Sequence, residues 1–203
     1  MSIHLLLAHR VDYDLVTLER QVFPLLTNEE KRQYKKFRAL SRRQEWLLVR
    51  FLLYVRLHIE ERIGYDSHGR PLLANSEQYL SISHSKEYVA VCLSERPCGV
   101  DIDSFDRRYS SLRHRFLSEQ EFSFFSTDQR WLALAWCAKE AMYKLLQRQG
   151  VIFARDMVLY PPKALQGFGY FYGRYVPESQ LVRLYYYKLT TAIITIAVYV
   201  YAS

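Results

Sequence analysis

Residues 129–148, QRWLALAWCAKEAMYKLLQR, decide the fold of this chain. Apolar side chains recur through them at helical spacing and make this the most apolar helix that the sequence predicts. Gly150 follows the stretch and is expected to end the helix. A helix with so many apolar side chains has to be covered, so we expect a sheet to pack against it.

A second long helix with a similar start lies earlier in the chain. Residues 43–47, RQEWL, open it in the way that residues 130–134, RWLAL, open the later helix. We expect this first helix to run from about 41 to 63 and to end at Gly64. Strands are predicted after both helices, so the order of patterns occurs twice in the chain.

The predicted strands have alternating or continuous apolar side chains. They lie at about 3–8, 79–84, 88–94, 98–103, 168–175, 181–188 and 192–201. Capping boxes predict two further helices, which begin after Thr27 and Ser118. We therefore predict an α+β fold of two similar halves, residues 1–100 and 101–203, packed as one compact unit. A pseudo-twofold axis is expected to relate the halves, each an antiparallel sheet packed against a long helix.

Composition indicates a globular protein with one sizeable core. Half of the 203 residues are hydrophobic, and no stretch approaches the roughly 20 apolar residues of a membrane span. The apolar N-terminus is too short for a signal peptide. Cys92, Cys98 and Cys137 match no zinc spacing and suggest free thiols in a reducing compartment. We therefore expect a cytoplasmic protein with no membrane partner.

The chain is basic, with a formal net charge of +7. Residues 31–70 hold eleven Lys or Arg and only four Asp or Glu. Such a patch suits an anionic partner, which could be nucleic acid, a phosphorylated cofactor, a membrane or an acidic protein. A solvated helix face without a partner explains the charge equally well.

Two acidic motifs carry the chemistry. In residues 99–103, GVDID, strand alternation puts Asp101 and Asp103 on one face. Two close carboxylates repel each other unless a cation lies between them, and oxygen ligands favour Mg²⁺ or Mn²⁺ over zinc. Two unrelated acids at an exposed strand end are an equally good explanation of this motif alone.

The second motif is residues 136–144, WCAKEAMYK, within the apolar helix. Glu140 and Lys144 are four residues apart and share a helix face, while Lys139 and Tyr143 form the adjacent stripe. The apolar surroundings argue against an ordinary surface ion pair. Three carboxylates and two lysines suit a metal-bridged pyrophosphate, because the metal takes oxygens and the lysines neutralise the remaining charge.

A third motif, SISHS at 81–85, could bind a phosphate or a ribose at a strand end, although a polar turn with an ordinary histidine is the simpler explanation in isolation. Together with GRP at 69–71, the three motifs occur in an order that resembles the 4′-phosphopantetheinyl transferases. The resemblance covers residues 27–144 and is greatest to the surfactin-synthetase-activating type, which has two fused pseudo-symmetric halves.

The resemblance implies an α+β fold and a defined reaction. Such enzymes transfer the 4′-phosphopantetheine arm of coenzyme A to a serine of an apo acyl or peptidyl carrier protein and release adenosine 3′,5′-bisphosphate. By this resemblance Asp101, Asp103 and Glu140 would hold Mg²⁺, or Mn²⁺. Lys144 would stabilise or protonate the leaving bisphosphate, and Glu140 would take the serine proton directly or through water. The residues expected to contact coenzyme A are Arg38, Arg43, Arg70, Ser83, His84, Asp101, Lys139 and Lys144.

The expected partners are coenzyme A and an acidic apo carrier protein, with no nucleic acid and no membrane, and a monomer would suffice. Two features depart from the family pattern. Asp103 stands where glutamate is commoner, and the segment between Asp103 and Ser118, which would help to grip the carrier, is short.

Three other functions compete with transfer. A metal-dependent nuclease would use acids, a lysine and a basic patch, but the usual acid-x-Lys spacing on one strand is missing. A non-catalytic module could hold coenzyme A or a carrier, although the intact acidic set argues against it. A glycosyltransferase could use the DID sequence, but the chain has no evident nucleotide-sugar domain.

Overall fold

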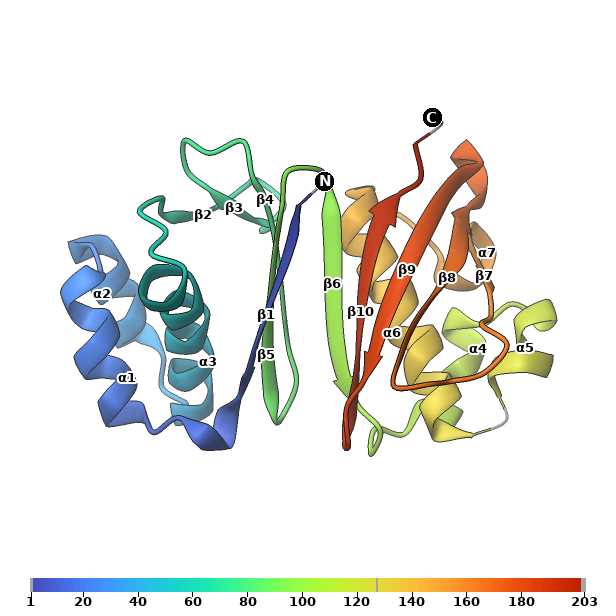
Figure 1. The fold of residues 1–203 in the computed structure, drawn as a ribbon, viewed down its shortest axis with the longest axis horizontal. Coiled ribbons are helices and arrows are strands. Elements are labelled where there is room, and N and C mark those ends of the chain that lie inside the picture. The colour runs from blue at the N-terminus through green and yellow to red at the C-terminus, as the bar shows by residue number, and fades with distance from the viewer. Residues whose placement is uncertain (1, 127, 202–203) are drawn as a thin grey trace.

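The computed structural model describes residues 2–126 and 128–201. Two antiparallel sheets face each other at the centre of the molecule, and helices cover the outer side of each sheet (Figure 1). The α+β fold with long helices packed on antiparallel sheets is therefore confirmed.

The first sheet has three strands in the order β1-β5-β4. These are β1 (Ile3–His9), β5 (Tyr88–Ser94) and β4 (Tyr79–His84). The helices on its outer side are α1 (Leu15–Val22), α2 (Asn28–Lys36) and α3 (Leu40–Arg50), the last continued by a π-helical turn, Phe51–Arg56. A short hairpin of β2 (Ile63–Tyr65) and β3 (Pro71–Leu73) precedes β4.

The second sheet has five strands in the order β6-β10-β9-β8-β7. These are β6 (Cys98–Ser104), β10 (Ala192–Tyr199), β9 (Gln180–Lys188), β8 (Phe168–Tyr175) and β7 (Met157–Tyr160). Helix α6 (Gln129–Leu146) packs on this sheet, accompanied by α4 (Arg113–Phe116), α5 (Glu119–Phe125) and α7 (Phe153–Asp156).

The core has three layers, one between each sheet and its helices and one between the two sheets, and β10 is buried on both faces. Ile193 and Ala197 face the core around α6. Ile194 and Ile196 point the other way and pack with side chains of the first sheet. This explains why β10 is an almost continuous apolar run: alternation of polar and apolar residues requires one solvent-facing side, and β10 has none.

The predicted strands and both capped helices are confirmed, with end residues shifted by at most two positions. The predicted boundary between residues 100 and 101 falls inside β6, because the chain passes from the first sheet to the second between Ser94 and Cys98. The sheets differ in strand number, and the pseudo-twofold relation stays a prediction.

Both predicted helix ends are wrong. His58, at φ 53°, takes the left-handed conformation soon after the π-helical turn, and Gly64 lies inside β2 instead of ending the helix. Helix α6 ends at Leu146, and the next residue, Gln147, is also left-handed at φ 53°, three residues before Gly150. Glycine is the cheapest residue in this conformation but not the only one that adopts it. Within the described ranges, no helix is long and apolar enough to cross a bilayer.

Candidate active site

The two sheets meet where β4 runs along β6. The Ser81 hydroxyl accepts the Val100 N–H at 2.9 Å, and the Ser83 hydroxyl accepts the Ile102 N–H at 3.2 Å. Alternate residues of a strand point to the same side, so the SIS sequence of β4 sends both hydroxyls toward β6. These buried contacts hold the strand that carries the aspartates against the first half of the molecule.

Helix α6 approaches the other side of β6 at Gly99. A Cβ built at this position would lie 2.0 Å from the Ala141 carbonyl oxygen and 2.8 Å from the Leu145 nitrogen. Only a residue without a side chain permits this distance. The glycine of the GVDID motif therefore brings the helix backbone onto the strand, so that Glu140 and Lys144 reach the aspartates.

Asp101 is buried and paired with Lys144. The Lys144 ammonium donates to Asp101 Oδ1 at 2.9 Å, to the Val100 carbonyl at 2.9 Å and to the Ile82 carbonyl at 3.3 Å. The Ser83 hydroxyl donates to the same Oδ1 at 2.8 Å. Ser83 therefore positions Asp101, and its hydroxyl has no donor left for the cofactor phosphate that the sequence assigned to it.

Asp103 is paired with a cation of its own. Its Oδ2 accepts from Arg107 Nη1 at 2.6 Å, and the Arg107 guanidinium lies 4.6 Å from the centre of the Trp136 ring on α6. No sequence pattern points to Arg107, which follows β6 in an irregular segment. The arginine links the end of the acidic strand to the helix and offsets one negative charge.

Glu140 is the third acid of the cluster. Burial raises the pKa of its carboxyl to about 7, and the negative charge of Asp101 acts in the same direction, against the opposing effects of Lys144 and Arg107. Among the described residues Glu140 makes no hydrogen bond or ion pair, so its oxygens are available to a ligand. A carboxyl with this pKa can accept or donate a proton near neutral pH.

The described residues contain no group of three or more His, Cys, Asp or Glu side chains arranged to hold a metal ion. The chemistry of the cluster nevertheless fits a divalent cation. Asp101 and Asp103 are each paired with a cation of the chain. The pKa of Glu140 is raised mainly by burial and further by the charges of Asp101 and Asp103, so the three carboxylates lie within electrostatic reach of one another. All donors are oxygens, which suits Mg²⁺ or Mn²⁺.

Lys139 does not belong to this site, in contrast to the sequence prediction of a cofactor contact. Its side chain is 0% exposed. The ammonium donates to Glu121 at 2.7 Å, to the Met157 carbonyl at 2.9 Å and to the Phe153 carbonyl at 3.1 Å. Because this side chain is wholly enclosed, Lys139 ties α6 to α5 and β7 and cannot contact a ligand. Lys144 also has three hydrogen-bond partners, but its side chain is 29% exposed, so a ligand can reach it.

The structure brings only some of the residues that were predicted to contact phosphate close to one another. His84 is about half exposed at the end of β4. Partial desolvation lowers the pKa of its imidazole, and the charges of Arg42 and Lys144 act in the same direction, against the opposing charge of Glu45. Arg42 Nη1 lies 3.3 Å from His84 Nε2. Arg43 was predicted here instead, but its Nε donates to the Phe37 carbonyl at 2.8 Å, on another side of α3. Arg38 is exposed in the connection before α3.

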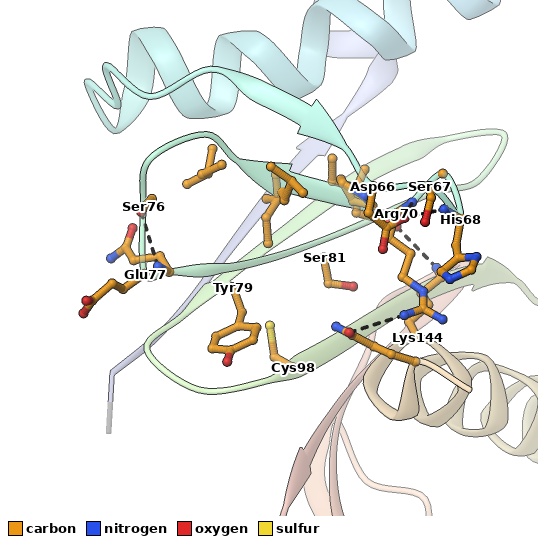
Figure 2. Close-up of a pocket in the computed structure, with 18 of the residues that line it drawn as sticks. Asp66, Ser67, His68, Arg70, Ser76, Glu77, Tyr79, Ser81, Cys98 and Lys144 are labelled. Atoms are coloured by element: carbon orange, nitrogen blue, oxygen red, sulfur yellow. Dashed lines mark hydrogen bonds between the residues drawn. The ribbon is translucent and has the colours of Figure 1, made fainter. Parts of the chain in front are cut away.

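A cavity of about 1230 Å³ opens beside the acidic cluster. It lies between the β2–β3 hairpin, β4 and the C-terminal end of α6 (Figure 2). Arg70 and Lys144 line one end of it, and Tyr79 and Cys98 line it farther from that end. Arg70 donates to Gln147 on α6 at 3.3 Å. The predicted contacts Arg70 and Lys144, from different halves, thus face one cavity.

Cys137 is a further neighbour of the cluster that the sequence did not single out. It is fully buried on α6, and its thiol donates to the Ile193 carbonyl at 3.6 Å. Burial, followed by the charges of Asp101 and Asp103, raises the pKa of this thiol. Cys137 is thus an uncharged residue beneath the carboxylates and not a nucleophile.

Comparison with known proteins agrees with this geometry over part of the chain. Residues 97–163 match the sequence model of the 4′-phosphopantetheinyl transferase superfamily, which is about a third of the chain. The matched segment includes all three acids and Lys144. No curated protein sequence shows significant similarity to the chain. The segment that forms the acidic cluster therefore carries the sequence features of the 4′-phosphopantetheinyl transferase superfamily.

Proposed function

We propose that this protein transfers the 4′-phosphopantetheine arm of coenzyme A to a serine of an apo acyl or peptidyl carrier protein, in the manner of the surfactin-synthetase-activating type. The observation that carries the proposal is the convergence of Asp101, Asp103 and Glu140 with Lys144 beside a large cavity, within a segment that matches the transferase superfamily.

In the proposed reaction the carrier serine oxygen attacks the phosphorus that carries the pantetheine arm. A new P–O bond forms to the serine, and the bond to the second phosphate breaks, releasing adenosine 3′,5′-bisphosphate. The nucleophile comes from the carrier, so the enzyme needs no nucleophile of its own. Its task is to position the reactants and to stabilise charge on the leaving group.

Glu140 is suited to accept the serine proton, because its pKa of about 7 leaves it partly ionised near neutral pH. Lys144 projects from the next turn of α6 and is suited to stabilise or protonate the leaving phosphate. Asp101, Asp103 and Glu140 would hold Mg²⁺, or Mn²⁺, which when bound supplies positive charge to the pyrophosphate. Ser83 holds Asp101 through its hydrogen bond, and Gly99 lets α6 lie close enough to β6 for Glu140 and Lys144 to reach the aspartates.

The cavity beside Lys144 is proposed to hold the nucleotide end of coenzyme A. Its volume of about 1230 Å³ is ample for a nucleotide, and Arg70 and Lys144 offer cations on the side nearest the acidic cluster. His84, at the end of β4, is proposed to contact a phosphate. Arg38, in the connection before α3, is proposed to add positive charge. The +7 charge of the chain suits an acidic carrier. We further propose a cytoplasmic monomer that binds neither nucleic acid nor membrane.

The proposal is tested by incubating the protein with coenzyme A, Mg²⁺ and an apo carrier protein and measuring adenosine 3′,5′-bisphosphate by chromatography. Release that requires the carrier serine, shown by its absence with a serine-to-alanine carrier, supports transfer. Coenzyme A binding without release from several carriers would contradict catalysis and favour a non-catalytic module. Cleavage of single- or double-stranded DNA in parallel reactions would favour the nuclease instead.

A further inference from the structure

A carboxylate lies among three basic side chains where the first helices meet the end of β4. Glu45 Oε1 accepts from Arg10 Nη1 at 2.8 Å, and Glu45 Oε2 from Arg42 Nη1 at 3.3 Å. His84 Nδ1 lies 3.8 Å from the same Oε2. Both carboxylate oxygens of Glu45 thus contact basic groups, and these groups come from three different parts of the chain.

The members of this cluster differ in their access to solvent. The side chains of Glu45 and Arg10 are only 13% and 11% exposed. Those of Arg42 and His84 are 49% and 45% exposed. The carboxylate therefore lies behind two basic groups that open outward.

The two outward groups present nitrogens to each other, since Arg42 Nη1 lies 3.3 Å from His84 Nε2. A guanidinium cannot accept a hydrogen bond, so within this pair Arg42 donates to an unprotonated His84 Nε2. An anion that approaches from solvent would meet the remaining N–H groups of Arg42, and an N–H donor at His84 Nε2 once that nitrogen is protonated. The same anion would also meet the negative charge of Glu45 at short range.

We propose that Glu45 competes with a bound phosphate for Arg42 and His84 and thereby sets the affinity of this subsite. The inference rests on the proposed function for the identity of the ligand, which is the phosphate on the ribose of coenzyme A. Glu45 is then a specificity-determining residue: it limits how tightly that phosphate is held, both in the substrate and in the bisphosphate product. Weaker binding of the product favours its release after each transfer.

The substitution Glu45→Gln removes the negative charge and keeps the shape. Arg10 would stay in place, because it also donates to Gln44 Oε1 at 3.1 Å, to the Ser41 carbonyl at 3.1 Å and to the Ser85 carbonyl at 3.3 Å. The glutamine oxygen can still accept from Arg10. Arg42 keeps its contacts with His84 Nε2 and with the Phe37 ring in this variant.

The test measures dissociation constants of coenzyme A and of dephospho-coenzyme A, which lacks only the ribose phosphate, by calorimetry. E45Q is expected to bind coenzyme A about tenfold more tightly than the unsubstituted protein, with little change for dephospho-coenzyme A. E119Q is the matched control: it changes the net charge equally at an exposed position on α5, and both affinities should stay unchanged. Unchanged or weaker binding of coenzyme A by E45Q would overturn the inference.

A second readout separates this inference from the proposed function. Inorganic phosphate is titrated while the imidazole resonances of His84 are followed by nuclear magnetic resonance. If the protein does not bind coenzyme A, the proposed function fails, but tighter phosphate binding at His84 in E45Q would still support the role of Glu45. Equal phosphate affinity in E45Q and the unsubstituted protein would overturn it.

Discussion

The Lys144 ammonium lies 2.9 Å from the Asp101 carboxylate and joins the two halves of the molecule, because the same nitrogen also donates to the Ile82 carbonyl of β4. One side chain therefore connects helix α6, the acidic strand β6 and the first sheet. The residue that we propose to stabilise the leaving group is also a structural contact at the junction.

Replacing Lys144 by methionine keeps most of the side-chain volume and removes the charge. We expect transfer to fall by about 10²-fold or more, as for loss of a group that stabilises developing charge. The measurement is the single-turnover rate with saturating coenzyme A. K163M removes an exposed lysine and should leave the rate unchanged. A K144M rate within a few-fold of the unsubstituted protein would rule out this role.

Glu140→Gln should abolish transfer and stabilise the metal-free protein at high pH. Burial raises the carboxyl pKa from its ordinary 4.5 to about 7. The folded state thus favours the protonated acid, a contribution that is complete below about pH 4.5 and is lost as the pH rises through about 7. E140Q should therefore be more stable at pH 8, by at most about 3 kcal/mol, and equally stable near pH 4.5.

The measurement for Glu140 is chemical denaturation at several pH values with and without Mg²⁺. Mg²⁺ should stabilise the unsubstituted protein at pH 8 and have little effect on E140Q, because ligands that bind the folded state raise its stability. The same Mg²⁺ response in both proteins would remove Glu140 from the metal ligands.

Lys139→Met tests whether Lys139, unlike Lys144, has a structural role only. The substitution leaves the Glu121 carboxylate buried without its cation, so we expect a loss of about 3 kcal/mol or more in the free energy of unfolding. The double variant K139M/E121Q should lose less than K139M. Coenzyme A affinity, measured where the variant is folded, should not change, and a tenfold loss would restore Lys139 to the binding site.

Gly99→Ala tests the close approach of α6 to β6. The added Cβ would meet the Ala141 carbonyl, so the helix must shift, and we expect the free energy of unfolding to fall by about 2 kcal/mol or more. G167A is the matched control, because a Cβ at that position meets nothing within 4 Å. Equal melting temperatures for the two variants would contradict the packing described.

The sequence predicts the strands and the acidic motifs well, because both depend on local patterns. Alternation in GVDID correctly puts Asp101 and Asp103 on one face, and the apolar helix correctly carries Glu140 and Lys144 to them. These residues act within two adjacent elements, so strand and helix periodicity suffice to place them.

Sequence patterns alone cannot show which of two nearby basic residues faces the site. Lys139 and Lys144 lie on different stripes of one helix, and only the position of Glu121 and two carbonyls shows that Lys139 is structural. Arg42 and Arg43 present the same problem on α3, where the Phe37 carbonyl takes Arg43 and leaves Arg42 beside His84. Such choices depend on tertiary partners distant in the chain.

The helix ends were mispredicted for a related reason. Gln147 follows the last residue of α6 in a conformation that glycine prefers, but its side chain accepts a hydrogen bond from Arg70 in the other half. The left-handed backbone conformation at Gln147 thus occurs together with a hydrogen bond from Arg70, whereas local propensity alone would put that conformation at Gly150. No signal within the helix itself reveals that contact.

Phosphopantetheine transfer is seen most clearly in the mass of the acceptor. The protein is incubated with coenzyme A, Mg²⁺ and an apo acyl carrier protein, and the carrier is weighed by intact mass spectrometry. We expect the carrier to gain the mass of one phosphopantetheine, and we expect no gain with a chelator or with D101A. A carrier mass that stays unchanged with several apo carriers, although coenzyme A binds, would contradict the proposed transfer.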